Sequence, residues 1–153
     1  MHFEQVRRGE LVAACCGFVL AISVFLNWYS TDFHNTNSRI NGQAMVKVSA
    51  WNSLSVLRWL FLLAAVAPLI LLWIVVREHQ LSWPRGELTA IVAIVAFVLC
   101  LVAGFVAKPG DPTDSISLQY GWYLAIVATL GMLAGAVQRT KETARVRKPP
   151  GVL

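Results

Sequence analysis

The chain has 153 residues, of which 57% are hydrophobic and 14% charged, and its mean hydropathy is +0.61. This composition is far more apolar than that of a soluble domain and indicates a single membrane domain over residues 1–153. The formal net charge of +5 does not indicate nucleic-acid binding, because the basic residues flank apolar segments instead of alternating with aromatics. Membrane lipids with anionic headgroups are the expected counter-charge, and no nucleic-acid partner is expected.

The segment from Leu54 to Val76 predicts a membrane helix. Its 23 residues contain one charge, Arg58. At a rise of about 1.5 Å per residue they span roughly the 30 Å of bilayer hydrocarbon. Since lipid offers no partner for exposed backbone groups, the other apolar segments are also expected to be helices. The predicted fold is therefore an all-α integral membrane bundle of four transmembrane helices, at about residues 11–29, 54–76, 88–107 and 120–137.

The connecting segments predict the orientation. Lys and Arg number nine on the side that holds both termini and the turn at residues 77–87, against three in the outer loops at residues 30–53 and 108–119. Both termini are therefore expected in the cytoplasm, in a multi-pass protein of the cell's inner (plasma) membrane. Asn41-Gly42 predicts a short extracellular β-hairpin, and the basic tail at residues 138–153 is expected to be largely disordered.

Aromatic and charged residues near the outer helix ends are candidate interfacial anchors. Arg58 lies four residues inside its helix, so its side chain can extend to the headgroups or pair with Asp111 or Asp114. Tryptophan favours the same depth because its ring is amphipathic. The alternative is that these residues form the mouth of a pore. The tryptophans concerned are Trp28, Trp51 and Trp122.

Rows of small residues predict close helix contacts. Gly131 and Gly135 form one row in the fourth helix, and Ala13, Gly17 and Ala21 form another in the first. Such rows let two helix backbones approach each other in a membrane. Both rows can pack the bundle itself, or one of them can serve an assembly with another protein.

A short internal repeat divides the chain into halves. The hexapeptide at residues 8–13, RGELVA, recurs as RGELTA at residues 85–90, each time before a helix that runs outward. Duplicated halves occur in transporters, but they also arise without transport. The other interpretation is that Arg-Gly-Glu is a favourable interfacial helix start, with the glutamate near the positive end of the helix dipole.

Short interfacial motifs at these positions resemble a family of small four-helix membrane proteins from high-GC Gram-positive bacteria. The resemblance covers the whole chain and implies fold and location only, because the family has no known activity. The motifs are Arg8-Gly9-Glu10, Asn27-Trp28-Tyr29, Ala50-Trp51, Pro109-Gly110 and Tyr120-Gly121-Trp122.

Two other four-helix families fit less well. The first-loop tryptophans loosely resemble those of claudins, but the chain lacks their two loop cysteines and its first loop is too short for their sheet. Quinone-linked thiol oxidoreductases need a C-x-x-C motif at the membrane surface. Here Cys15 and Cys16 are adjacent within an apolar helix, and Cys100 also lies in an apolar segment, so all three are expected to be packing residues.

No catalytic, cofactor-binding or metal site is predicted. No Asp, Glu, Lys or His lies in the middle of a span, and the three histidines, at positions 2, 34 and 79, occupy separate polar segments. The preferred function is a non-enzymatic interaction or accessory protein that binds another membrane protein or itself. The alternative is a homo-oligomeric channel. Its outer mouth would be lined by Asn52, Ser53, Ser55 and Arg58.

Overall fold

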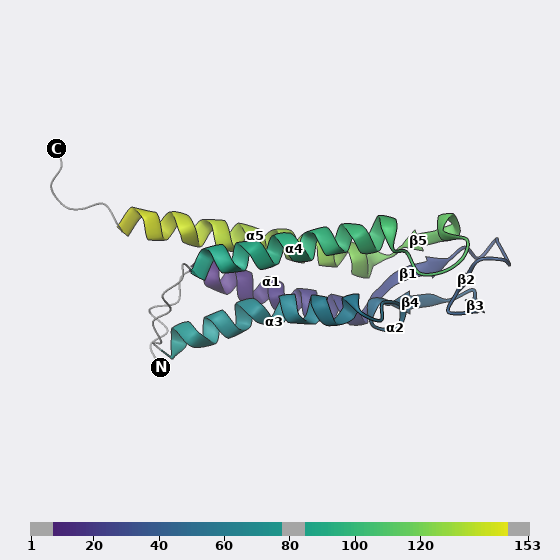
Figure 1. The fold of residues 1–153 in the computed structure, drawn as a ribbon, viewed down its shortest axis with the longest axis horizontal. Coiled ribbons are helices and arrows are strands. Elements are labelled where there is room, and N and C mark those ends of the chain that lie inside the picture. The colour runs from purple at the N-terminus through teal and green to yellow at the C-terminus, as the bar shows by residue number, and fades with distance from the viewer. Residues whose placement is uncertain (1–7, 78–84, 147–153) are drawn as a thin grey trace.

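The computed structural model describes residues 8–77 and 85–146. Within these residues, four helices are long and apolar enough to cross a membrane, as the hydropathy pattern predicts. They lie side by side along the long axis of the molecule, and every strand gathers at one end (Figure 1). The helices are α1 (Arg8–Phe25), α3 (Leu57–Val76), α4 (Arg85–Leu101), which continues into the π-helical turn η2 (Val102–Val106), and α5 (Tyr120–Val146).

Two helix ends differ from the prediction. Helix α1 ends at Phe25 and not at residue 29, because the next residues pair as a strand. Helix α5 continues to Val146, so the start of the predicted disordered tail is helical. The segment QRTKETARV contains no glycine or proline that would end the helix.

Helix α1 packs between α5 and α3, and α4 contacts the same two helices. Small residues make this possible. A Cβ atom at Gly17 would lie 2.6 Å from the carbonyl oxygen of Ala65 and 2.7 Å from the ring of Pro68 in α3. The two backbones therefore approach each other at a position where only glycine fits.

A three-stranded antiparallel sheet covers one end of the bundle, opposite the two termini (Figure 1). Its central strand β1 (Asn27–Thr31) pairs with β4 (Lys47–Ser49) and with β5 (Ile116–Leu118). Two of these strands come from the first outer loop and one from the second. Residues 116–118 supply the third strand. The sequence predicts only a short hairpin within these segments, so the sheet is an addition to the predicted all-α fold.

The predicted hairpin at Asn41-Gly42 is confirmed. Strands β2 (Arg39–Ile40) and β3 (Gln43–Ala44) flank the turn, whose two residues have φ angles of 52° and 79°. A two-residue turn of this type requires positive φ at both positions, which Asn and Gly tolerate. The hairpin is fixed by two backbone hydrogen bonds of 3.0 Å between Arg39 and Asp111 of the other outer loop.

The sheet is amphipathic. Side chains directly opposite each other on paired strands lie on the same face, and faces alternate along a strand. Tyr29 is opposite Leu118 and Thr31 is opposite Ile116, and all but the half-buried Leu118 are almost fully buried. The neighbouring row, Lys47, Ser30 and Ser117, lies on the other face. One face thus packs on the protein and the other is polar.

Candidate functional site: a polar groove on the sheet

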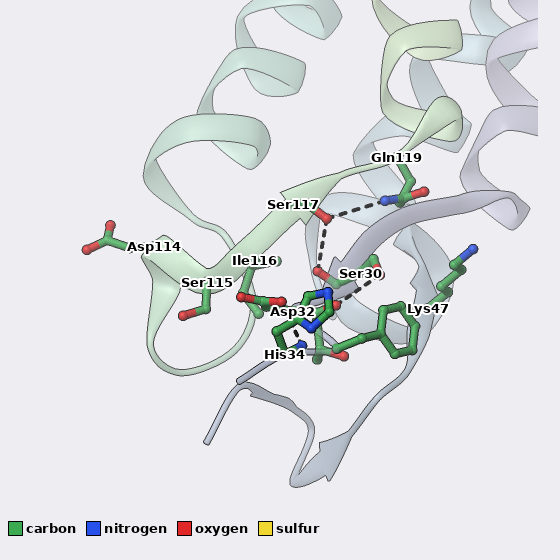
Figure 2. A pocket seen from close by; sticks show the side chains of 11 residues that line it. Ser30, Asp32, His34, Lys47, Asp114, Ser115, Ile116, Ser117 and Gln119 are labelled. Carbon is green, nitrogen blue, oxygen red and sulfur yellow. Dashed lines mark hydrogen bonds between the residues drawn. The ribbon is translucent and has the colours of Figure 1, made fainter. Parts of the chain in front are cut away.

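A groove of about 480 Å³ lies on the polar face of the sheet. Figure 2 shows its central side chains, which come from β1, from the turn that follows β1, and from β5. Lys47 and Asp114 lie at opposite sides of the groove and point away from each other (Figure 2). The residues that line the groove are Ser30, Thr31, Asp32, Phe33, His34, Lys47, Asp114, Ser115, Ile116, Ser117 and Gln119.

The floor of the groove is held by hydrogen bonds across the strands. The hydroxyl of Ser117 donates to the carbonyl oxygen of Ser30 at 3.3 Å, and Nε2 of Gln119 donates to the Ser117 hydroxyl at 3.3 Å. Ser30 itself is only 3% exposed. The floor is therefore a polar surface held by cross-strand hydrogen bonds, and among the described residues the side-chain oxygen of Gln119 has no hydrogen-bond partner and can accept one.

Asp32 is held in one orientation at the centre of the groove. Its Oδ1 accepts a hydrogen bond of 2.9 Å from the backbone N–H of His34, and its own N–H donates to the buried Ser38 hydroxyl at 3.2 Å. This is the turn geometry that aspartate favours. In the described part of the chain, Oδ2 of Asp32 has no hydrogen-bond partner. The adjacent Phe33 is 49% exposed and adds an apolar surface to the groove.

No functional role is predicted for the central residues of the groove from the sequence. The sequence does contain a pattern that indicates strands here, because polar residues alternate in Ser30, Asp32 and His34 and again in Ser115, Ser117 and Gln119. Alternation with a period of two is typical of a strand with one solvated face. In the described residues, no group of three His, Cys, Asp or Glu side chains could hold a metal ion.

Trp28 in β1 and Trp122 in the first turn of α5, both predicted as interfacial anchors, are buried inside the protein. Trp28 is fully buried, and its Nε1 donates to the Ser23 carbonyl at the end of α1 at 2.7 Å. Trp122 is 6% exposed, and its Nε1 donates to the Cys100 carbonyl at 2.8 Å. Both indoles therefore satisfy carbonyl groups at helix ends. The described aromatics with more than half of their surface exposed in this part of the bundle are Phe25, Trp59, Phe105, Tyr120 and Tyr123.

The π-helical turn η2 joins α4 to the sheet. The hydroxyl of Tyr29 in β1 donates to the carbonyl oxygen of Ala103 in this turn at 2.9 Å. Burial, with a smaller contribution from Cys100, raises the pKa of the Tyr29 phenol above its ordinary value. The hydroxyl thus remains protonated, as a hydrogen-bond donor, over the physiological pH range.

Arg58 is held by tryptophans and not by a carboxylate. Its guanidinium lies 4.8 Å from the ring centre of Trp51 and 5.7 Å from that of Trp59, and Nη1 donates to the Trp51 carbonyl at 2.9 Å. No ion pair joins it to Asp111 or Asp114 in the described residues. Arg58 and Trp51 therefore fasten the short helix α2 (Ala50–Ser53) to the start of α3.

Replacing Arg58 with lysine is expected to destabilise the protein by about 1–2 kcal/mol, because the planar guanidinium stacks on indole rings and an ammonium does not. A melting curve in detergent measures the loss. Arg77→Lys is the matched control, since that guanidinium lies 4.7 Å from one ring, that of Trp73, at an exposed position. A loss for Arg58→Lys no larger than for the control would contradict the stacking role.

The predicted rows of small residues lie between helices of this chain. Gly135 faces the backbone of Gly9 and Ala13, and Gly131 faces Cys16. In α1, which also carries Ala13 and Gly17, Ala21 is half-buried against the hydrophobic core. The structure therefore uses both rows inside the bundle, between α1 and α5 and between α1 and α3.

Comparison with known proteins identifies no further site residue. No protein-family model, curated protein or solved structure matches this chain. The function proposed next is therefore argued from the groove and its chemistry.

Proposed function

We propose that this chain is a small membrane protein with four transmembrane helices that acts as a non-enzymatic interaction or accessory protein. It binds another membrane protein through the polar face of its outer sheet. The observation that carries the proposal is the groove, where a fixed carboxylate and a half-exposed phenyl ring lie beside hydrogen-bonding groups. A central aromatic with a polar surround is typical of protein interfaces.

The arrangement of the polar groups supports a role other than catalysis. An enzyme active site needs a nucleophile, a base and an orienting group in mutual contact. In the described residues, no hydrogen bond joins the His34 imidazole to a serine hydroxyl. The serine hydroxyls at positions 30 and 117 donate to backbone carbonyl groups instead.

The alternative function, a homo-oligomeric channel, gains no support from the residues predicted at its mouth. The Ser53 hydroxyl donates to the Ser49 carbonyl at 2.7 Å, and the Arg58 guanidinium stacks on indole rings. These side chains therefore stabilise the short helix α2 and its junction with α3. The channel is kept as one outcome of the test below.

The test is the mass and composition of the complex extracted gently from native membranes, measured by native mass spectrometry. We expect a complex that contains this chain and a different membrane protein. Asp32→Asn, which removes the charge at the centre of the groove, should lower the amount of that partner, whereas Asp111→Asn outside the groove should not. A closed ring of identical copies would favour the channel instead.

We also propose that both termini face the cytoplasm and the sheet faces outward, in the plasma membrane. The excess of Lys and Arg at the end opposite the strands supports this orientation. The resemblance to membrane proteins of high-GC Gram-positive bacteria supports the same location.

In a variant without native cysteines, single cysteines at Thr36 and Asp114 are expected to react with an impermeant thiol reagent in intact cells. A cysteine at Thr143 should react only after the cells are opened, because the basic end of the chain is retained in the cytoplasm. Gel-shift labelling measures all three. Labelling of the Thr143 position in intact cells would reverse the orientation.

A further inference from the structure

Resting on the proposed function, we propose that Asp32 binds a basic side chain of the protein partner, whose apolar stem lies on the ring of Phe33. The site is the centre of the groove, and the ligand is a lysine or arginine in a polypeptide segment that crosses the polar face of the sheet. The juxtaposition of a fixed carboxylate and an exposed phenyl ring on consecutive residues carries the proposal.

The carboxylate of Asp32 is preorganised for one cation. Oδ1 is occupied by the His34 N–H, and the backbone of Asp32 is tied to Ser38, so the position of Oδ2 is set before a partner arrives. A preformed acceptor loses little conformational entropy on binding. Hydrogen bonds between a carboxylate and an ammonium or guanidinium are also stronger than neutral ones.

Phe33 supplies an apolar surface, which an isolated surface carboxylate lacks. An exposed ion pair in water contributes little, because solvent screens it. Long basic side chains pack their methylene stems on apolar surfaces while the charged head reaches a polar group. With 49% of its surface exposed, Phe33 offers such a surface on the residue next to Asp32, in the lining of the same groove. Covering it excludes water and strengthens the ion pair.

The charge of the groove argues against an anionic ligand. The ionised side chains that line it at neutral pH are two carboxylates, Asp32 and Asp114, and one ammonium, Lys47. The ammonium points away from the groove in Figure 2, and the central group is a carboxylate. A phosphate or carboxylate ligand would meet repulsion at the centre, whereas a cationic side chain meets attraction.

The test is photo-crosslinking in native membranes. The benzoyl derivative of phenylalanine is placed at Phe33 in the full-length chain, and the crosslinked peptide is sequenced by mass spectrometry. It is expected to come from another protein and to contain a lysine or arginine next to the crosslink. Asp32→Asn should lower the crosslinking yield at least tenfold, a factor that corresponds to one well-desolvated charge interaction.

Asp32→Asn removes the charge but retains the local turn, because the side-chain oxygen of asparagine can still accept the hydrogen bond from the His34 N–H. Asp111→Asn is the matched charge control on the same side of the protein, at an exposed residue outside the groove. It should leave the yield unchanged. Replacing the identified basic residue of the partner with alanine should lower the yield to the same extent, and combining it with Asp32→Asn should lower it no further.

Several outcomes would overturn the proposal. They are a crosslinked peptide without a nearby basic residue, a yield that Asp32→Asn does not lower, adducts with glycan or lipid alone, and no adduct at all. These results differ from a failure of the proposed function. If native mass spectrometry finds a different membrane protein in the complex but the Phe33 adduct does not depend on Asp32, only the present inference fails. A ring of identical copies would remove both.

Discussion

Gly135→Ala is expected to destabilise the bundle by about 3 kcal/mol, the upper part of the range for overpacking a well-packed interior. A Cβ atom at this position would lie 2.7 Å from the carbonyl oxygen of Gly9 and 2.8 Å from the backbone nitrogen of Ala13. Both neighbours are main-chain atoms, which cannot rotate away, so α1 and α5 must separate. The melting midpoint in detergent should fall by roughly 10 °C.

Gly131 provides the matched comparison. A Cβ atom there would lie 2.5 Å from Sγ of Cys16, the end of a side chain that can move. Gly131→Ala should therefore cost less than Gly135→Ala, and adding Cys16→Ala should recover most of the loss. Ala134→Leu, at an exposed position on the same helix, should have little effect. Equal midpoints for the two glycine variants would mean that α1 and α5 are not in backbone contact at Gly135.

Arg139→Leu is the second change with a large expected effect. Nη2 of Arg139 lies 2.7 Å from Oε1 of Glu10, and the two side chains are 14% and 5% exposed. Removing the arginine leaves a buried carboxylate without this partner, which typically costs about 3–5 kcal/mol. The measurement is again the melting midpoint in detergent, compared with Lys141→Leu, which removes a charge at an exposed position of the same helix.

The double variant Glu10→Leu with Arg139→Leu separates the ion pair from mere packing. Replacing both members of a buried pair with apolar residues is often close to neutral, because neither charge is left to be solvated. The double variant should therefore be more stable than Arg139→Leu alone. If it is less stable than Arg139→Leu alone, the ion pair itself contributes net stability to the bundle.

The fold was partly predictable because its main constraint is local. A run of apolar residues such as Leu57–Val76 identifies a span by length alone, and Asn41-Gly42 identifies a hairpin by its two backbone conformations. The sheet was not predictable in this way, because β1 pairs with β5 from a distant part of the sequence. Pairing over that separation depends on which helices lie side by side.

The contacts of the buried Trp28 and Trp122 side chains also could not be predicted from the sequence. An indole at a helix end suits the membrane interface and a buried site equally, since both provide an apolar region beside a hydrogen-bond acceptor. Only the three-dimensional structure shows that Trp28 bonds Ser23 of its own chain. The stacking of Arg58 could be predicted more easily, because Trp59 is its neighbour in the sequence and Trp51 lies seven residues earlier.

The pairing of β1 with β5 determines when the groove exists during biosynthesis. Thr31 is opposite Ile116, so 85 positions separate the two residues along the chain. At about 5–20 residues per second, the ribosome needs roughly 4–17 s to make that length. The helices α1, α3 and α4 precede Ile116 in the chain, so they are made while the groove still lacks its third strand. A partner that recognises the groove can therefore bind only after β5 has been synthesised and has paired with β1.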